Sequence, residues 1–215
     1  MNHGLISDRI GYTFREPSLL RRALTHRSFG ADHNERLEYL GDSVVNCLVA
    51  LELYDRFPQL SEGELSRIRA NLVNQRALQG IAVNMGLGDQ LLLGEGELKS
   101  GGAARPSILA DAVEAIIGAV VIDGGFPAAQ QVLRRLFGEN LDAVNPGISG
   151  KDAKTRLQEF VQGRGLPLPV YTLLGTRGQA HAQSFEVQCA IAGLGIRTEG
   201  RGGSRRAAEQ DAAGK

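Results

Sequence analysis

Asn34-Glu-Arg-Leu-Glu-Tyr-Leu-Gly-Asp-Ser43 is the stretch from which the fold of this chain can first be read. Its acids Glu35, Glu38 and Asp42 stand at i, i+3 and i+7, which places all three on one face of an α-helix. The apolar residues of the same segment occupy other angles around the helix: Leu37, Leu40, Val44 and Leu48. The stretch therefore predicts a helix that packs through one side and presents carboxylates on another.

Helical patterning continues on both sides of this stretch, up to about residue 145. Apolar residues recur at spacings of three and four, and Gly and Pro separate the periodic segments. Ser61 with Glu64 three residues later has the pattern of a capping box. The clearest helices are expected to begin near Pro17, Asn34, Ser61, Asn74, Ser107 and Pro127. We therefore predict an all-α domain over residues 1–147.

Beyond that domain the pattern changes. Asn145-Pro-Gly-Ile-Ser-Gly150 consists of turn formers without apolar periodicity, so we place a linker at 148–152. A helix is expected over 153–162 and another over 204–213, which the glycine-rich stretch 200–204 would open. Strand-like alternation covers 170–176, 183–192 and 195–198. The chain is thus predicted to be multi-domain, with an all-α domain followed by a small α+β domain (153–215) of order α-β-β-β-α.

A second pair of acids, Asp111 and Glu114, lies in Ile108-Leu-Ala-Asp-Ala-Val-Glu-Ala-Ile-Ile-Gly118, a segment otherwise made of apolar and small residues. Burying an unpaired carboxylate is costly, and this helix supplies no Lys or Arg, so a cation is the economical partner. Oxygen ligands suit Mg²⁺ or Mn²⁺, and the lack of clustered His and Cys disfavours zinc. The alternative is a solvated acidic face paired with arginines, for which Arg36 is adjacent.

Composition and charge limit the classes of protein to which this chain can belong. Lys and Arg total 24 and Asp and Glu total 24, a net charge of +0 that taken alone argues against a nucleic-acid partner. No apolar run approaches a membrane helix and no secretory signal is evident, so we expect a cytoplasmic protein with no membrane association. Cys47 and Cys189 each lie in an apolar segment and are expected to be buried free thiols.

The motif Asn34–Ser43 closely resembles the signature of the ribonuclease III family, and Leu24-Thr-His-Arg-Ser28 resembles the segment that precedes it in that family. The resemblance covers essentially the whole chain. Further matching segments follow in order: Phe57-Pro58, Glu62-Gly63, Gly96–Gly102 and Ile108–Gly118.

The resemblance implies roles for the acids. Glu38, Asp111 and Glu114 match the family's Mg²⁺ ligands, with Mn²⁺ as a substitute. Asp42 matches an acid that orients the nucleophilic water, so that Asp42 and Glu114 are the catalytic pair. Glu35 and Glu62 match supporting acids. The implied enzyme is a homodimeric endonuclease that cuts double-stranded RNA to 5′-phosphate and 3′-hydroxyl ends with short 3′ overhangs, in the processing of ribosomal RNA precursors and other structured RNAs.

The carboxy-terminal domain resembles a double-stranded-RNA-binding domain. A-form RNA hides its base edges in a deep groove, so such domains place polar groups on 2′-hydroxyls and cations on phosphates. Arg205 and Arg206 stand in the first turn of the last helix, where cations oppose the helix dipole, so helix stability does not explain them. Because the chain stops at Lys215, we expect a short last helix and marginal stability. The residues implied to contact RNA are Lys154, Thr155, Gln158, Glu159, His181, Arg205 and Arg206.

Two other classes of function remain open at this point. A non-cleaving RNA-binding protein would share the carboxy-terminal domain, but it has no need for carboxylates beside a phosphate backbone that repels them. A helical metal hydrolase of small phosphate esters would leave that domain unexplained. Asn74 and the 94–102 loop either meet phosphates or only form turns. His26 and His33 are expected to cap helix ends.

Overall fold

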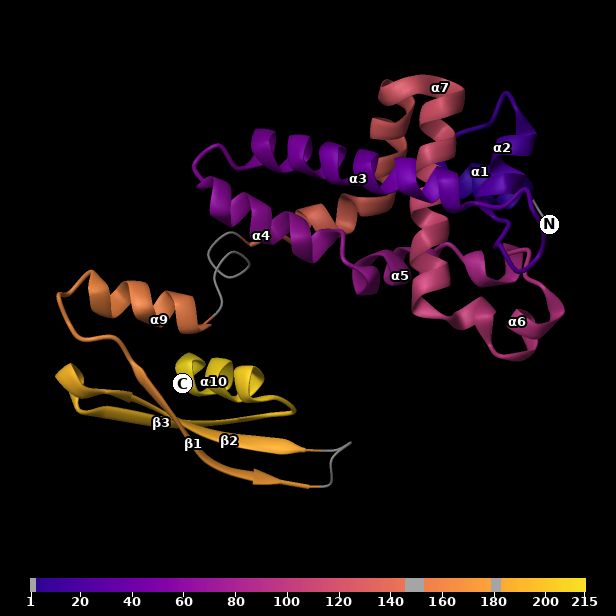
Figure 1. Ribbon diagram of the computed structural model, residues 1–215. Helices are drawn as coiled ribbons and strands as arrows, with labels where there is room; N and C mark the ends of the chain where they lie inside the picture. Colours follow the sequence, from indigo (N-terminus) through magenta and orange to yellow (C-terminus); the bar gives the residue numbers. More distant parts are fainter. Residues whose placement is uncertain (1–2, 146–152, 179–182) are drawn as a thin grey trace. The chain divides into compact units, whose positions relative to one another are not determined.

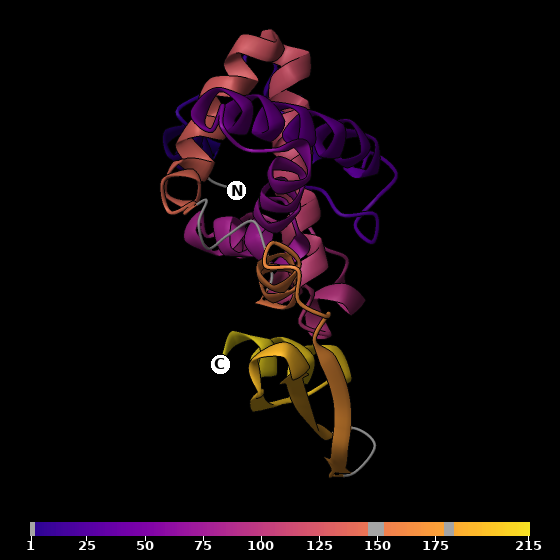
Figure 2. The same cartoon turned by 90° about the vertical axis from the view of Figure 1, so that its left-hand side faces the viewer.

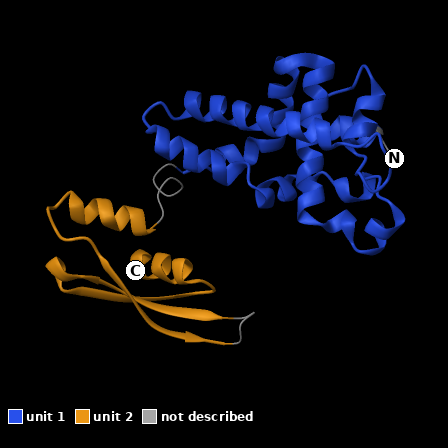
Figure 3. Ribbon diagram, viewed as in Figure 1, with its two compact units in different colours: residues 1–146 blue, residues 147–215 orange. Residues whose placement is uncertain are grey.

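A computed structural model describes residues 3–145, 153–178 and 183–215 of the chain (Figure 1). It divides into two compact units, residues 1–146 and 147–215 (Figure 3). The linker expected at 148–152 lies outside the described residues, as does His181. None of the described helices combines the length and hydropathy that crossing a membrane requires.

The amino-terminal unit is helical, as its apolar periodicity predicts, and its only strand-like pairing in the described residues is an isolated bridge between Thr25 and Leu92. Its helices are α1 (His3–Ile10), α2 (Pro17–Ala23), α3 (Glu35–Arg56), α4 (Glu62–Leu72), α5 (Gln75–Asn84), α6 (Glu95–Lys99) and α7 (Pro106–Asp142), with 3₁₀ turns η1 (Leu87–Gln90) and η2 (Gly102–Ala104).

Local sequence explains where these helices begin. Ser61 and Glu64 form the predicted capping box at the start of α4, and the Asn74 side chain accepts a hydrogen bond from the Ala77 N–H to cap α5. Asn34 precedes α3 and is buried, with its amide donating to the Ala23 carbonyl. The starts of α4 and α5 are thus fixed by side chains that the sequence already displays, whereas Asn34 forms no side-chain cap on α3.

Helix α7 forms the centre of the unit. Gly125 (φ 78°, ψ 178°) interrupts it, and Pro127 follows, so the helix has two arms, residues 106–124 and 126–142, which Figures 1 and 2 show joined at a bend. Only glycine adopts such a φ without strain. The first arm is buried almost throughout between α3 and α5. The helix predicted to start near Pro127 is the second arm.

The carboxy-terminal unit has the predicted α-β-β-β-α order. It comprises α9 (Ala153–Gln162), β1 (Val170–Arg177), β2 (Ser184–Ile191), the turn η3 (Ala192–Leu194), β3 (Ile196–Gly202) and α10 (Arg205–Gly214). The strands form an antiparallel sheet in the order β1-β2-β3. Both helices lie on the same side of this sheet (Figures 1 and 2). Val187 and Cys189 of β2 are buried with Ala208 and Ala212 of α10.

Two expectations are corrected. The glycine-rich stretch that was expected to open the last helix belongs in part to β3, which continues to Gly202. A side chain at Gly200 would overlap the backbone of Ala208 and Ala212, so glycine is needed there because α10 packs directly on the strand. Cys47 is exposed, while Cys189 is buried as predicted. Within its apolar segment, α3 turns Val44, Val45, Leu48 and Val49 inward and Cys47 outward.

Candidate active site

The site forms where α3 crosses the first arm of α7. At this crossing the two helix backbones touch, because each helix has a glycine facing the other. A side chain at Gly41 would overlap the Glu114 carbonyl, and one at Gly118 would overlap the Leu37 carbonyl. Glu38, Asp111 and Glu114 each lie within about two turns of the glycine on their own helix, so the close approach brings the two acidic sets together.

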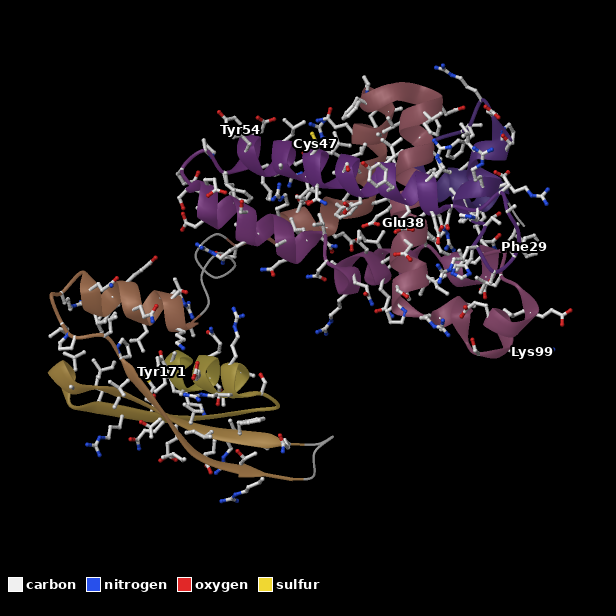
Figure 4. The ribbon with its side chains drawn as sticks, in the orientation of Figure 1. Phe29, Glu38, Cys47, Tyr54, Lys99 and Tyr171 are labelled. Atoms are coloured by element: carbon white, nitrogen blue, oxygen red, sulfur yellow. The ribbon has the colours of Figure 1, made fainter. Side chains whose placement is uncertain are left out.

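Three of the predicted acids meet at this crossing. Glu38 of α3 and Asp111 and Glu114 of α7 each offer a carboxylate oxygen, and these oxygens lie within 4.8 Å of one another. All three side chains are partly buried. Figure 4 labels Glu38 beside the crossing. In the described part of the chain, no Lys or Arg forms an ion pair with any of the three. A solvated face neutralised by arginines therefore does not describe this cluster.

The electrostatics of the cluster are unfavourable to three bare carboxylates. Burial, and then the charges of Asp111, Glu35 and Asp42, raise the pKa of Glu38. Burial also raises the pKa of Asp111, while His26 acts in the opposite direction. Burial and the charges of Asp42, Asp111 and Glu38 raise the pKa of Glu114 to about 7. A bound cation would relieve both causes, and an all-oxygen donor set fits a hard divalent cation.

The remaining acids of α3 lie at the edge of the cluster. Asp42 is exposed, and Asn46 Nδ2 donates to its Oδ1 at 3.0 Å, which orients the carboxylate. Glu35 accepts from Arg27 at 3.3 Å and lies 3.7 Å from His33 Nδ1. Glu35 thus has an arginine partner, which sets it apart from the three acids of the cluster within the described residues.

Glu62 lies elsewhere within the chain. It begins α4, accepts a hydrogen bond from the Ser66 hydroxyl at 2.8 Å, and lines an apolar groove of 390 Å³ with Tyr54 and Leu65. Tyr54 follows Glu38 by sixteen residues of α3, which corresponds to roughly 24 Å of helix. A single chain therefore does not bring Glu62 to the cluster.

Sequence reasoning missed four contributors: Gly41, Gly118, His26 and Ser28. The signal for the two glycines was a glycine inside an otherwise periodic helix, which often marks close packing. His26 caps no helix, contrary to expectation, because its ring is bound by Ser28. No signal in the sequence pointed to that contact.

A family model described as ribonuclease-III-like matches residues 16–141, more than half of the chain. The chain belongs to the ribonuclease III family. A second model, for the double-stranded RNA binding motif, matches residues 153–215. The chain is therefore an endonuclease of the ribonuclease III family with a double-stranded-RNA-binding domain, and double-stranded RNA is its partner.

Curated relatives match along nearly the whole chain. The protein named Ribonuclease 3 from Thiobacillus denitrificans is 60% identical over 217 residues, covering 99% of this chain and 96% of the relative. Ribonuclease 3 from Ralstonia pickettii is 59% identical over 213 residues, covering 99% of this chain and 83% of the relative. Members of the ribonuclease III family with this name thus share both units of the chain.

Solved structures match the helical unit. The nuclease domain of ribonuclease III from Campylobacter jejuni superposes with a TM-score of 0.64 at 41% identity, covering 67% of this chain and 99% of that one. A second structure of that domain has a TM-score of 0.63 at 42% identity, over 65% of this chain and 98% of that one. Its description concerns structural flexibility in a region involved in dimer formation.

The RNA-binding candidates of this ribonuclease III lie on α9 and at the start of α10. Lys154 is partly occupied within the protein: its ammonium pairs with Glu209 at 2.6 Å and lies 4.5 Å from the centre of the Tyr171 ring. Arg205 contacts Glu209 at 3.1 Å but is exposed, as is Arg206. Thr155, Gln158 and Glu159 share α9 with Lys154.

Proposed function

We propose that this ribonuclease III uses Mg²⁺, held by Glu38, Asp111 and Glu114, to hydrolyse both strands of double-stranded RNA to products with 5′-phosphate and 3′-hydroxyl ends and short 3′ overhangs. The observation that carries the proposal is the convergence of these three carboxylates, none of which pairs with a Lys or Arg among the described residues. Mn²⁺ has the same preference for oxygen ligands and is the expected substitute.

Each residue of the cluster has a distinct part in this chemistry. Bound Mg²⁺ supplies Lewis-acid activation of water and neutralises charge on the phosphodiester. Glu38 and Asp111 hold the cation from opposite helices, and Glu114 holds it beside Asp42. Asp42, fixed through Asn46, accepts a hydrogen bond from the attacking water and so aligns it with phosphorus. We assign Asp42 and Glu114 as the catalytic acids and Glu35 as a support that keeps Arg27 in place.

We further propose that two copies of the chain act together. Helix α3 presents Tyr39 (80% exposed), Cys47, Leu51 and Tyr54 (70% exposed) within one arc of its surface. Large aromatic side chains so exposed are typical of surfaces that bind another protein. A second copy covering this arc would also cover the groove at Glu62, giving that acid a place near the partner surface. The dimer formation ascribed to the Campylobacter domain supports this proposal.

The biological substrates we propose are ribosomal RNA precursors and other structured RNAs. A double-stranded-RNA-binding domain recognises duplex shape and 2′-hydroxyls more than sequence, so selection would depend on duplex length and regularity.

The decisive experiment uses a long, end-labelled RNA duplex, incubated with Mg²⁺, with Mn²⁺ or with chelator. A Glu114→Gln variant and a single-stranded RNA of the same sequence serve as controls. Short duplexes should appear with metal and wild-type protein and disappear with chelator or with the variant. Mapping the product ends tests the 3′ overhang, and sedimentation at micromolar concentration tests the dimer.

The outcomes separate the alternatives. A duplex that is bound but left intact with every metal would establish a non-cleaving RNA-binding protein instead. Cleavage that persists in chelator would reject the metal site while leaving the nuclease. A monomer that nevertheless produces paired cuts would reject the proposed dimer.

A further inference from the structure

A polar pocket of 330 Å³ adjoins the carboxylate cluster. Two of its walls are Glu38 and Asp111, so its contents would lie directly beside the proposed cation. Its lining also carries hydrogen-bond donors: the His26 ring, the guanidinium groups of Arg27 and Arg105, and the Ser107 hydroxyl. The carboxylates of Glu35 and Glu97 line it as well.

The orientation of His26 is fixed by its neighbours. The backbone N–H of Ser28 donates to His26 Nδ1 at 3.2 Å, and the Ser28 hydroxyl lies 2.8 Å from the same atom. That hydroxyl accepts from the Gly94 N–H at 2.9 Å, which turns its own proton toward His26. Because Nδ1 is an acceptor here, the ring proton of the neutral imidazole is on Nε2. Nε2 is the ring nitrogen that does not contact Ser28, and the ring lines the pocket together with Asp111.

The two arginines are also held in place. Arg105 pairs with Glu97 at 2.6 Å and donates to the Ser100 hydroxyl at 3.1 Å, and Arg27 donates to Glu35 at 3.3 Å. Glu35 and Glu97 are therefore the counter-ions of the arginines. Once a cation occupies Glu38 and Asp111, an anion in the pocket would face N–H and O–H donors whose positions are already set, which lowers the entropy cost of binding it.

We propose that this pocket is a phosphate subsite. In it, His26 Nε2–H, Arg27 and Arg105 would hold the phosphodiester that neighbours the hydrolysed phosphodiester on the same RNA strand. The proposal rests on the proposed function, because the cluster fixes which phosphate is cleaved. A pocket of this size holds one nucleotide unit. The subsite would hold the strand on one side of the cleavage position. The scissile phosphorus would then lie in line with the attacking water that Asp42 orients.

The test combines protein variants with altered RNA. A duplex carries a single methylphosphonate linkage, which removes one phosphate charge, at successive positions on either side of the cleavage site. It is offered to wild-type protein and to the variants His26→Leu and Arg105→Gln. His26→Gln, whose amide N–H replaces Nε2–H, is the conservative variant. Lys99→Gln, which removes an exposed cation at the end of α6 and outside the pocket, is the matched control.

One linkage position should stand out. At that position the methylphosphonate should slow cleavage by wild-type protein about 10- to 100-fold, which corresponds to the loss of one charged hydrogen bond. Cleavage by Arg105→Gln or His26→Leu, which already lack one partner of that phosphate, should be slowed little by the same linkage. His26→Gln should recover part of the wild-type response, and Lys99→Gln should match wild type. The same pattern should appear when each variant is combined with Glu114→Gln and its equilibrium binding of the intact duplex is measured. This measurement requires no catalysis.

Contrary results have distinct meanings. If every linkage slows the variants as much as wild type, the subsite is rejected although the nuclease stands. If wild-type protein with metal leaves the duplex intact, the proposed function itself fails. Inhibition by inorganic phosphate that Arg105→Gln abolishes, without a sensitive linkage, would show a free-anion site and overturn the strand contact. Should His26→Leu lower the melting temperature, Arg105→Gln, with its side chain 44% exposed, still decides the question.

Discussion

Gly41 of α3 and Gly118 of α7 touch across the helix crossing: a β-carbon built on Gly118 would stand 3.1 Å from the Gly41 nitrogen. The same β-carbon would overlap the Leu37 carbonyl, so there is no room for a side chain between the helices. Glu38, Asp111 and Glu114 owe their proximity to that contact, since each lies within about two turns of one of the two glycines. The spacing of the helices therefore determines the spacing of the proposed ligands.

Gly118→Ala should destabilise the protein and reduce cleavage. Overpacking against backbone costs about 1–3 kcal/mol and exceeds the roughly 0.5–1 kcal/mol that alanine contributes to helix propensity. Urea unfolding measures the first effect and duplex cleavage the second. Gly138→Ala, also in α7 but with open space around the glycine, should instead stabilise the protein and leave cleavage unchanged. Equal effects of the two variants would contradict the packing argument.

Glu114→Gln should stabilise the metal-free protein at neutral pH. Glu114 titrates near 7 in the folded state and near 4.5 in the unfolded chain. Below pH 4.5 the carboxyl is neutral in both states and contributes nothing. As pH rises from 4.5 to 7, only the unfolded chain loses the proton, so wild-type stability falls relative to the variant, and above 7 the difference is constant.

Thermal melting of wild type and Glu114→Gln in chelator, between pH 4 and pH 8, measures that difference. Adding Mn²⁺ should raise the wild-type melting temperature more at pH 8 than at pH 5 and should have less effect on the variant. A difference that grows toward acid would show that burial does not raise the pKa of Glu114.

Glu52→Ala should destabilise the helical unit by about 1–3 kcal/mol. Glu52 is 4% exposed and accepts hydrogen bonds from Gln130 at 3.1 Å and Arg134 at 2.7 Å, which tie α3 to the second arm of α7. Arg134 is half exposed and would regain water, which limits the loss. Asp142→Asn removes the exposed partner of Arg56 and should cost less than about 1 kcal/mol in the same unfolding assay.

Replacing Arg205 and Arg206 together by Gln should weaken duplex binding and lower its salt dependence. Each phosphate contact contributes close to one unit to the slope of log affinity against log salt, so the slope should fall by about 1–2. Binding measured from low to physiological salt gives the slope. Arg197→Gln, on the strand face turned away from α10, is the control. An unchanged slope in the double variant would exclude phosphate contacts there.

Local features of the fold could be predicted from the sequence because their causes are local. The Ser61–Glu64 capping box and the Asn74 cap appear where their side chains indicated. The helical spacing of Glu38 with Asp42, and of Asp111 with Glu114, also holds. Each of these relationships spans less than two turns of one helix, so the backbone period alone sets it.

Relationships between elements could not be predicted in this way. Nothing in the spacing around Gly41 says which helix it meets. The expectation that Gly200 opens the last helix is wrong because Gly200 belongs to β3 and packs against α10, which lies later in the chain. Cys47 was expected to be buried because its neighbours are apolar, although its angle on α3 turns it outward. The His26 tautomer depends on a loop more than sixty residues away, which no local pattern reveals.

The two halves of the cluster also differ in when they are made. A ribosome releases α3 long before the first arm of α7, so a nascent chain carries Glu38 without the acids that complete its site. The proposed cation site is therefore completed only when α7 docks against α3 through Gly118. Under the proposed function, the order of synthesis would then keep the chain inactive until its helical unit has folded.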